Sequence, residues 1–312
     1  MRKLHYRGAI RQIPIYLGKF FRMFIYMSDW KVLPMSALIA MLVSYVACNN
    51  MFKYMEGATM GSMALTCACL WNGCFNSIQA VCRERDIVKR EHRSGMRIAS
   101  YISAHMIYQG FLCLMQTIIT ITVCRFMKIP FPTEGFITPF FLLDIGITLF
   151  LITFSADMMS LMISCVVRNT TSAMTVMPLV LIVQLVFSGI LFTLDGSIQK
   201  FSKLTIANWG MRCINSQANY NSLPMVSVWN QIFKFRNYEV NGLTPVKTFT
   251  DYIEQNNLRD DFLRETAAQQ FNPVYDHTVR NIASCWGMLL LFTIVFVLLS
   301  MLFLSMIDKD KR

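Results

Sequence analysis

Long apolar stretches alternate with polar segments along the 312 residues of this chain. Several stretches exceed the ~18 residues that a helix needs to cross the hydrocarbon core of a bilayer. The pattern therefore predicts a mostly α-helical, polytopic membrane protein with six transmembrane helices. We place the spans at residues 32–52, 58–81, 98–124, 136–167, 172–194 and 281–306.

Polar segments divide the chain around these spans. Residues 1–31 mix basic side chains with isoleucine, leucine and phenylalanine, which is typical of an amphipathic helix in the headgroup region. A surface anchor with no further role is an equally good interpretation. We expect a cytoplasmic amphipathic helix, five spans with a charged cytoplasmic helix at 83–94, a small irregular extracytoplasmic domain, and a sixth span with a basic tail. The four parts cover residues 1–31, 32–195, 196–280 and 281–312.

Basic residues orient the predicted spans. Only 15% of the residues are charged, against roughly 25% in soluble domains, so the distribution of the +11 net charge matters more than its size. The N-terminal segment, residues 83–94 and the C-terminal tail share one side, whereas the short loops opposite carry only Lys53, Arg125 and Lys128. The positive-inside rule then makes both termini cytoplasmic. We expect the lipid bilayer, and no nucleic acid, as the partner of this basic chain.

The sequence offers few candidates for catalytic chemistry. It contains no GxxxxGK[ST] phosphate loop, no HExxH and no GxSxG motif. We therefore expect the chain to bind no metal or cofactor and not to be an enzyme by itself. Most of its ten cysteines lie in apolar stretches, where thiols behave as small hydrophobic groups. Cys213 lies in the long polar segment; a free thiol is the main interpretation, and a bridge to Cys285 or to a second copy is the alternative.

Polar side chains also occur inside the predicted spans. Asn72, Asn76 and Gln79 lie three to four residues apart, so they share one face of the second span. Such a stripe faces either a neighbouring helix or a ligand cavity at a subunit interface. Asp144 and Asp157 lie in the fourth span. Intramembrane acids are candidates for proton coupling or for binding a cationic substrate, unless the long span brings them to an interface.

Charge is concentrated between the second and third spans, at residues 83–93. A short helix here can lie along the cytoplasmic membrane surface, with Ile87 and Val88 facing apolar neighbours. It can receive a push from a cytosolic partner and pass it to the attached spans. A solvated loop that obeys the positive-inside rule is the plainer alternative.

Several short motifs follow one another in a specific order. They are RQ…SDWK within 11–31, NGCFNS at 72–77, RER…RE…G within 83–95, MPL…FSGIL within 177–191 and NW at 208–209. This order resembles the membrane domain of ABC exporters of the G subfamily, with its connecting helix, second span, coupling helix and fifth span. The resemblance extends over nearly the whole chain.

The resemblance implies a permease that moves an amphipathic or hydrophobic substrate outward by alternating access. Two such domains, either two copies or one copy and a paralogue, are expected to pair about a two-fold axis. ABC ATPase subunits bind ATP and Mg in such complexes, and their closure is relayed through the coupling helix.

The resemblance also assigns roles to individual positions. The substrate-cavity positions are Asn72, Phe75, Ile182 and Leu185, and the outer hydrophobic gate is Ile190 and Leu191. The positions assigned to ATPase coupling are Arg83, Glu84, Arg85, Arg90 and Glu91.

Family members usually carry the ATPase ahead of the connecting helix, whereas this sequence starts at that helix. We therefore expect a separate ATPase chain, a prokaryotic source and a location in the cell (plasma or inner) membrane. Two other functions stay open: a proton-coupled secondary transporter that uses Asp144 and Asp157, and a membrane sensor or scaffold that reads a ligand through 196–280. The sequence shows no internal repeat of the kind found in many secondary transporters, which favours the exporter.

Overall fold

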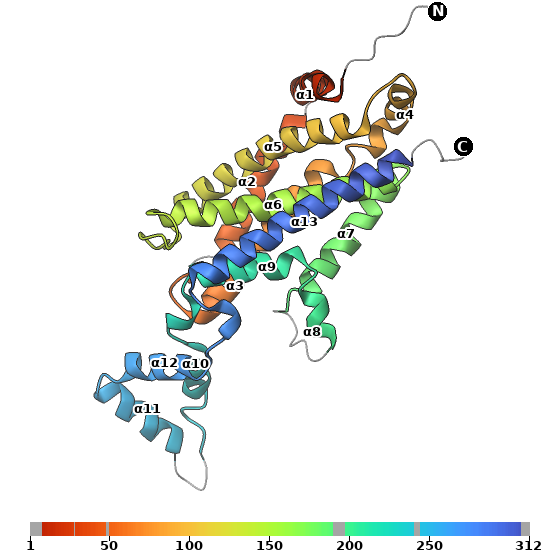
Figure 1. Ribbon diagram of the computed structural model, residues 1–312. Coiled ribbons are helices and arrows are strands. Elements are labelled where there is room, and N and C mark those ends of the chain that lie inside the picture. Colours follow the sequence, from red (N-terminus) through yellow and green to blue (C-terminus); the bar gives the residue numbers. More distant parts are fainter. Residues whose placement is uncertain (1–7, 28, 48–49, 190–196, 240–243, 307–312) are drawn as a thin grey trace, which may run out of the picture.

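The computed structural model describes residues 8–27, 29–47, 50–189, 197–239 and 244–306. The described chain is mostly helical, with one isolated bridge between Glu134 and Phe140. Six helices correspond to the six predicted spans and run side by side (Figure 1). They are α2 (Val32–Ala47), α3 (Met55–Ser77), α5 (Ile98–Phe126), α6 (Phe141–Val166), α7 (Thr170–Val186) and α13 (Val279–Ser305).

Four described segments are long and apolar enough to cross a membrane by length and composition. They are Asp29–Val46, which contains most of α2, and the helices α5, α6 and α13. α7 has only 17 residues, and α3 is interrupted by small and polar residues along its 23 residues. These helices agree with the prediction of a membrane protein. The six-span topology and its orientation stay predictions.

The bundle is built around α6. In the most apolar 18-residue stretch of α6, 72% of the residues are buried, against 22% in the corresponding stretch of α13. α6 is therefore the central helix, and α13 keeps a broad outer face. α3 and α13 make the most extensive contacts with α6. The α3–α6 crossing is close because Gly73 has no side chain: a Cβ built there would lie 2.3 Å from the Thr153 carbonyl oxygen.

The long polar segment has more structure than the sequence predicts. Its helices are α8 (Ser197–Ser202), α9 (Ile206–Gln217), α10 (Ser227–Lys234), α11 (Pro245–Gln255) and α12 (Arg259–Ala268). α9 is not part of an outer domain, because it packs against α3, α6 and α13 and is largely buried. The irregular domain expected over 196–280 is therefore reduced to a small helical unit, α10–α12, which projects from the bundle (Figure 1).

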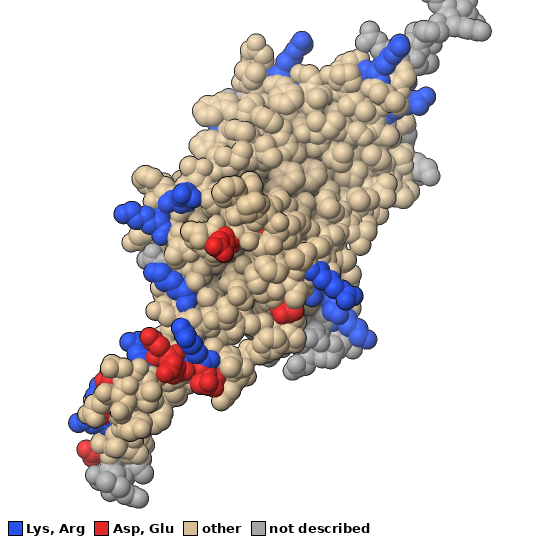
Figure 2. Space-filling model, turned by 60° about the vertical axis from the view of Figure 1, so that its left-hand side comes forward, with Lys and Arg blue, Asp and Glu red and all other residues tan. Residues whose placement is uncertain are grey.

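The two remaining helices lie at the opposite end of the molecule from α10–α12. They are α1 (Ala9–Tyr26) and α4 (Arg85–Arg93) (Figure 1). A wide band of uncharged surface separates the basic side chains at this end from the charged side chains at the other (Figure 2). Such a band matches the hydrocarbon region of a bilayer, with charges left to the two aqueous sides.

Candidate functional site

The predicted charged helix at 83–94 is present. A 3-10 turn, Cys82–Glu84, leads directly into α4, and Gly95 ends the segment with a φ of 104°. Glycine suits this position because other residues rarely adopt positive φ. Val88 is fully buried as predicted, but Ile87 is 42% exposed, so only one of the two apolar side chains faces the bundle. The difference arises because successive helical residues are about 100° apart around the axis.

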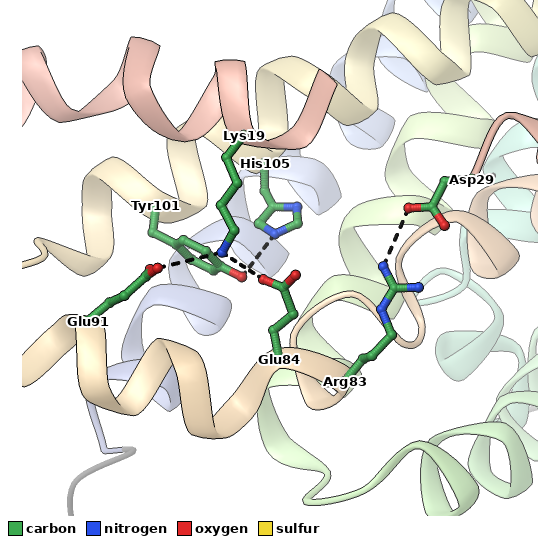
Figure 3. Close-up of polar contacts among 7 residues, drawn as sticks. All are labelled: Lys19, Asp29, Arg83, Glu84, Glu91, Tyr101 and His105. Carbon is green, nitrogen blue, oxygen red and sulfur yellow. Dashed lines mark hydrogen bonds and ion pairs between the residues drawn. The ribbon is translucent and has the colours of Figure 1, made fainter. Parts of the chain in front are cut away.

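An ion-pair cluster joins α4 to α1 (Figure 3). The Lys19 Nζ lies 3.0 Å from Glu84 Oε2 and 3.7 Å from Glu91 Oε1. Glu84 is nearly buried, whereas Lys19 and Glu91 are about one-third exposed. Burial raises the pKa of Tyr16 to about 12, and the nearby Glu91 carboxylate adds to the effect. One lysine thus holds two predicted coupling acids against the amphipathic helix.

Hydrogen bonds fix the start of α1 in the same place. The Gln12 side chain donates to the Gly95 carbonyl at 3.2 Å and accepts from the Arg97 amide at 2.9 Å. The Ser100 hydroxyl donates to the Ala9 carbonyl at 2.8 Å. α1 is therefore attached both to α4 and to the start of α5. This supports the connecting-helix interpretation over a surface anchor with no further role.

The apolar face of α1 packs on α5. Phe20 is 3% exposed, and its ring centroid lies 5.7 Å from Tyr101 and 3.9 Å from His105. His105 Nε2 lies 3.1 Å from the Tyr101 hydroxyl, and both side chains lie beside Lys19 of the ion-pair cluster (Figure 3). Ser100-Tyr101 had been expected only as the start of the third span, and no role was predicted for His105. The four-residue spacing of these two residues is the one signal that was available.

The basic coupling residues have three different surroundings. Arg85 Nη1 donates to the carbonyls of Cys165 and Val167, both at 3.0 Å, and so caps the end of α6. Arg83 lies 3.4 Å from Asp29 at an exposed rim. Arg90 is exposed. The structure therefore places Arg85 in a link to α6, and leaves Arg90 on the outer face of α4.

A cavity of about 230 Å³ lies beside the cluster, between α1, α3 and α5. Its lining includes Phe75, Gln79, Arg83, His105 and Gln109. The His105 Nδ1 and Gln109 Oε1 atoms are buried and have no hydrogen-bond partner in the part of the chain that the structure describes. These atoms need water or another polar group, since buried polar atoms are costly without partners.

With this geometry in view, the comparison with known proteins is decisive for the family. The sequence matches the model of the family described as ABC-2 type transporter over residues 17–216, which is more than half of the chain. The chain belongs to the ABC-2 type transporter family. The match begins within α1 and ends within α9, so it includes the ion-pair cluster and the central helix α6. No curated protein matches the sequence.

Within the described residues of this ABC-2 chain, the four cavity positions assigned by resemblance do not line one common described pocket. Asn72 is buried at 4% exposure, and Leu185 is partly buried against the core. Phe75 is 37% and Ile182 is 56% exposed, although α3 and α7 touch. Phe75 alone of the four lines the described 230 Å³ cavity.

The outer-gate positions Ile190 and Leu191 lie outside the described residues. The helix that leads to them, α7, begins at a regular cap. Asn169 accepts a hydrogen bond from the Ser172 amide at 2.8 Å, as is usual for an N-cap asparagine. This cap gives Asn169 a structural role in the ABC-2 domain.

The polar stripe of α3 meets other helices of the ABC-2 domain. Asn76 and Gln116 exchange two hydrogen bonds of 2.9 Å. Asp157 of α6 accepts from Ser77, from the Cys113 thiol at 3.2 Å and from Asn76 Nδ2 at 3.4 Å. Helix–helix hydrogen bonding, the plainer of the two interpretations, thus applies to Asn76. Sequence reasoning missed Gln116, Cys113 and Ser77 as partners because they are remote in the chain.

Asp144, the second intramembrane acid, binds the loop that precedes its own helix. Its carboxylate accepts from the backbone amides of Phe136, Ile137 and Thr138 at 2.8, 2.9 and 3.0 Å. An acid in the first turn of a helix is also favoured by the helix dipole. The position is that of a loop clamp near the end of a span, as anticipated for an acid close to an interface.

Proposed function

We propose that this ABC-2 protein is the permease subunit of an ATP-driven exporter, and that α4 is its coupling helix. In this proposal ATP and Mg are bound by an ABC ATPase, the usual partner of ABC-2 permease domains. The observation that carries the proposal is the attachment of α4 to two separate elements, α1 through Lys19 and α6 through Arg85.

The links to α6 make α4 a suitable relay. The Ser164 hydroxyl of α6 accepts from the backbone amides of Val81 and Cys82 at 3.0 and 3.1 Å, next to the Arg85 contacts. α6 in turn packs along α3 and α13. A displacement of α4 is therefore passed to the centre of the bundle rather than absorbed by a loose loop.

The outer face of α4 supplies a surface for an ATPase. Asp86, Arg90 and Arg93 follow at helical spacing and are exposed, and Ile87 beside them is 42% exposed. An exposed apolar side chain within a charged rim is typical of a docking surface. Glu84 and Glu91 face α1 instead, so we assign them to the internal relay rather than to direct ATPase contact.

Substrate passage is proposed to occur between two permease chains. The exposed apolar side chains of α3 and α7, among them Phe75 and Ile182, would line that space. An apolar lining suits an amphipathic or hydrophobic substrate. With the α4 end cytoplasmic, the substrate would leave outward past Ile190 and Leu191. The expected location is the cell membrane of a prokaryote.

The proposal is tested by purifying the tagged chain from its native host in mild detergent and identifying co-purifying proteins by mass spectrometry. We expect a stoichiometric ABC ATPase. Arg90→Glu should reduce its recovery, whereas Arg236→Glu in the remote α10–α12 unit should not. A folded chain that purifies without any ATPase would oppose the exporter and favour the proton-coupled alternative.

A further inference from the structure

A pair of thiols occupies the junction of α9 and α13. Cys213 of α9 and Cys285 of α13 are both fully buried, and they share a small cluster with Ile282. Both thiols pack in this one buried cluster across the two helices, and Cys213 Sγ also lies 3.4 Å from the Thr148 hydroxyl. The sequence analysis placed Cys213 in an outer polar segment; the structure buries it within the bundle.

Hydrogen bonds of Asn281, one helical turn before Cys285, set the register between α9 and α13. Asn281 Oδ1 accepts from Arg212 Nε at 2.9 Å and from Arg212 Nη2 at 2.6 Å. Asn281 Nδ2 donates to the Ser216 hydroxyl at 2.8 Å. Cys285 follows Asn281 by four residues, and Cys213 lies between the two α9 partners of Asn281. The Asn281 contacts therefore hold α9 and α13 in the register that places both thiols in one cluster.

Other described cysteines have different surroundings. The Cys113 thiol donates to Asp157, the Cys74 thiol to the Ala156 carbonyl at 4.0 Å, and the Cys82 thiol to the Ile78 carbonyl at 3.6 Å. Thiols of that kind serve as small packing groups with local hydrogen bonds. Two thiols that pack in one buried cluster across two helices have a further chemistry, because a disulfide forms where two cysteines approach closely.

We propose that Cys213 and Cys285 form a reversible disulfide that fastens α9 to α13. In the reaction one thiolate attacks the disulfide of an oxidant, such as an extracytoplasmic thiol–disulfide oxidoreductase, and a thiol of the oxidant leaves. The second cysteine thiolate then attacks the mixed disulfide and releases the other thiol. Each cysteine loses one proton, and the two electrons end on the reduced oxidant. Because both sulfurs are buried, exchange requires α9 to separate from α13 or to be still undocked.

A Cys213–Cys285 disulfide would also affect α7, the helix that leads to the predicted gate. α9 also holds the end of α7: Asn208 Nδ2 donates to the Ser188 carbonyl at 2.9 Å, and the Ala207 amide donates to Gln184 Oε1 at 3.3 Å. A disulfide would therefore tie α7 to α13 through α9, and restrict any movement of one against the other. The proposal does not depend on an ATPase partner, since it concerns only contacts within this chain.

The test uses the full chain in membranes treated with diamide, which takes up two electrons and two protons from a pair of thiols. Free thiols are blocked with N-ethylmaleimide under denaturing conditions, the protein is reduced, and newly released thiols are counted by mass shift and mapped by peptide mass spectrometry. We expect release at Cys213 and Cys285 in a near 1:1 ratio, and at least a tenfold excess over the other mapped cysteines.

Two variants and a control sharpen the result. Cys213→Ala and Cys285→Ala should each abolish the release at the remaining partner, whereas Cys165→Ala should leave it unchanged. The non-reduced digest of the wild-type protein tests the disulfide without any variant. If the proposal is right, the digest contains the linked Cys213–Cys285 peptide. Full blocking of both thiols after diamide treatment would overturn the proposal, and so would a link between the Cys213 residues of two chains.

Discussion

Two buried carboxylates of this ABC-2 protein, Asp157 and Glu84, are stabilised by opposite kinds of partner. Asp157, fully buried at the crossing of α3, α5 and α6, has the neutral partners Ser77, Asn76 and Cys113. Glu84, nearly buried at the end of the bundle, has the cationic partner Lys19. An acid with neutral donors in the bilayer is held in one fixed network, whereas an ion pair beside water can break and re-form at low cost.

The difference suggests a division of labour. The Asp157 network joins three helices, so it fixes the register of the core. The Lys19 cluster joins α1 to α4, whose outer face is proposed to meet the ATPase, so it can change with each cycle. Removing a member of the first cluster should therefore affect folding, and removing a member of the second should affect coupling.

The largest expected effect is on Asp157. Asp157→Leu removes the shared acceptor of three donors, and we expect the free energy of unfolding to fall by about 3–5 kcal/mol. Thermal unfolding in detergent, followed by fluorescence-detected size exclusion, measures this effect. Asp157→Asn keeps an acceptor and should retain most of the folded protein. If Asp157→Asn is well folded but transport is lost, the purely structural role is wrong and the proton-coupled alternative gains support.

Close packing beside Asp157 gives a second test of the rigid region. A Cβ at Gly73 would lie 2.3 Å from the Thr153 carbonyl and 2.8 Å from the Asp157 amide nitrogen, so Gly73→Ala must push α3 and α6 apart. We expect a loss of about 1–3 kcal/mol in the same thermal assay. Gly287→Ala in α13 is the matched control, because a Cβ there would meet no described atom within 4 Å beyond its chain neighbours and its own helix backbone. Equal effects of the two substitutions would contradict the close α3–α6 crossing.

The surface cluster should respond in activity rather than in stability. Glu91→Ala removes one partner of Lys19, and we expect a severalfold decrease in substrate-stimulated ATPase activity of the complex, with assembly intact. Glu254→Ala, which removes a 4.0 Å ion pair with Arg236 in the α10–α12 unit, is the control. Unchanged coupling in Glu91→Ala would remove the proposed role of the cluster.

The smallest expected effect is the coupling energy of the ion pair itself. A double-mutant cycle with Lys19→Met and Glu84→Gln should give an interaction of about 0.5–1 kcal/mol, since Lys19 is partly exposed to solvent. Chemical unfolding in detergent measures the four free energies of unfolding. A much larger value would mean that this cluster is as rigid as the Asp157 network, and the contrast between the two regions would fail.

The candidate site was predictable in part. Composition and position predicted a charged segment between two spans, but charge alone left a surface helix and a solvated loop equally open, and the structure shows the helix. The link from Arg85 to the α6 carbonyls had no local signal, since 80 and 82 residues separate the partners. The exposure of Ile87 also depended on how α4 is rotated against the bundle, which hydropathy does not specify.

The sequence by itself determined most elements of this protein, because apolar stretches of sufficient length must become helices in a bilayer. The motif order indicated an ABC permease domain, and the ABC-2 family match supports that coarser assignment. Only the tertiary structure decided which polar side chains meet. Lys19 and Glu84 are 65 residues apart, and Ser77 and Asp157 are 80 residues apart. The sequence predicted α9 in an outer domain, whereas the tertiary structure places it in the core. The periodicity of one segment does not show which neighbouring surfaces that segment will pack against.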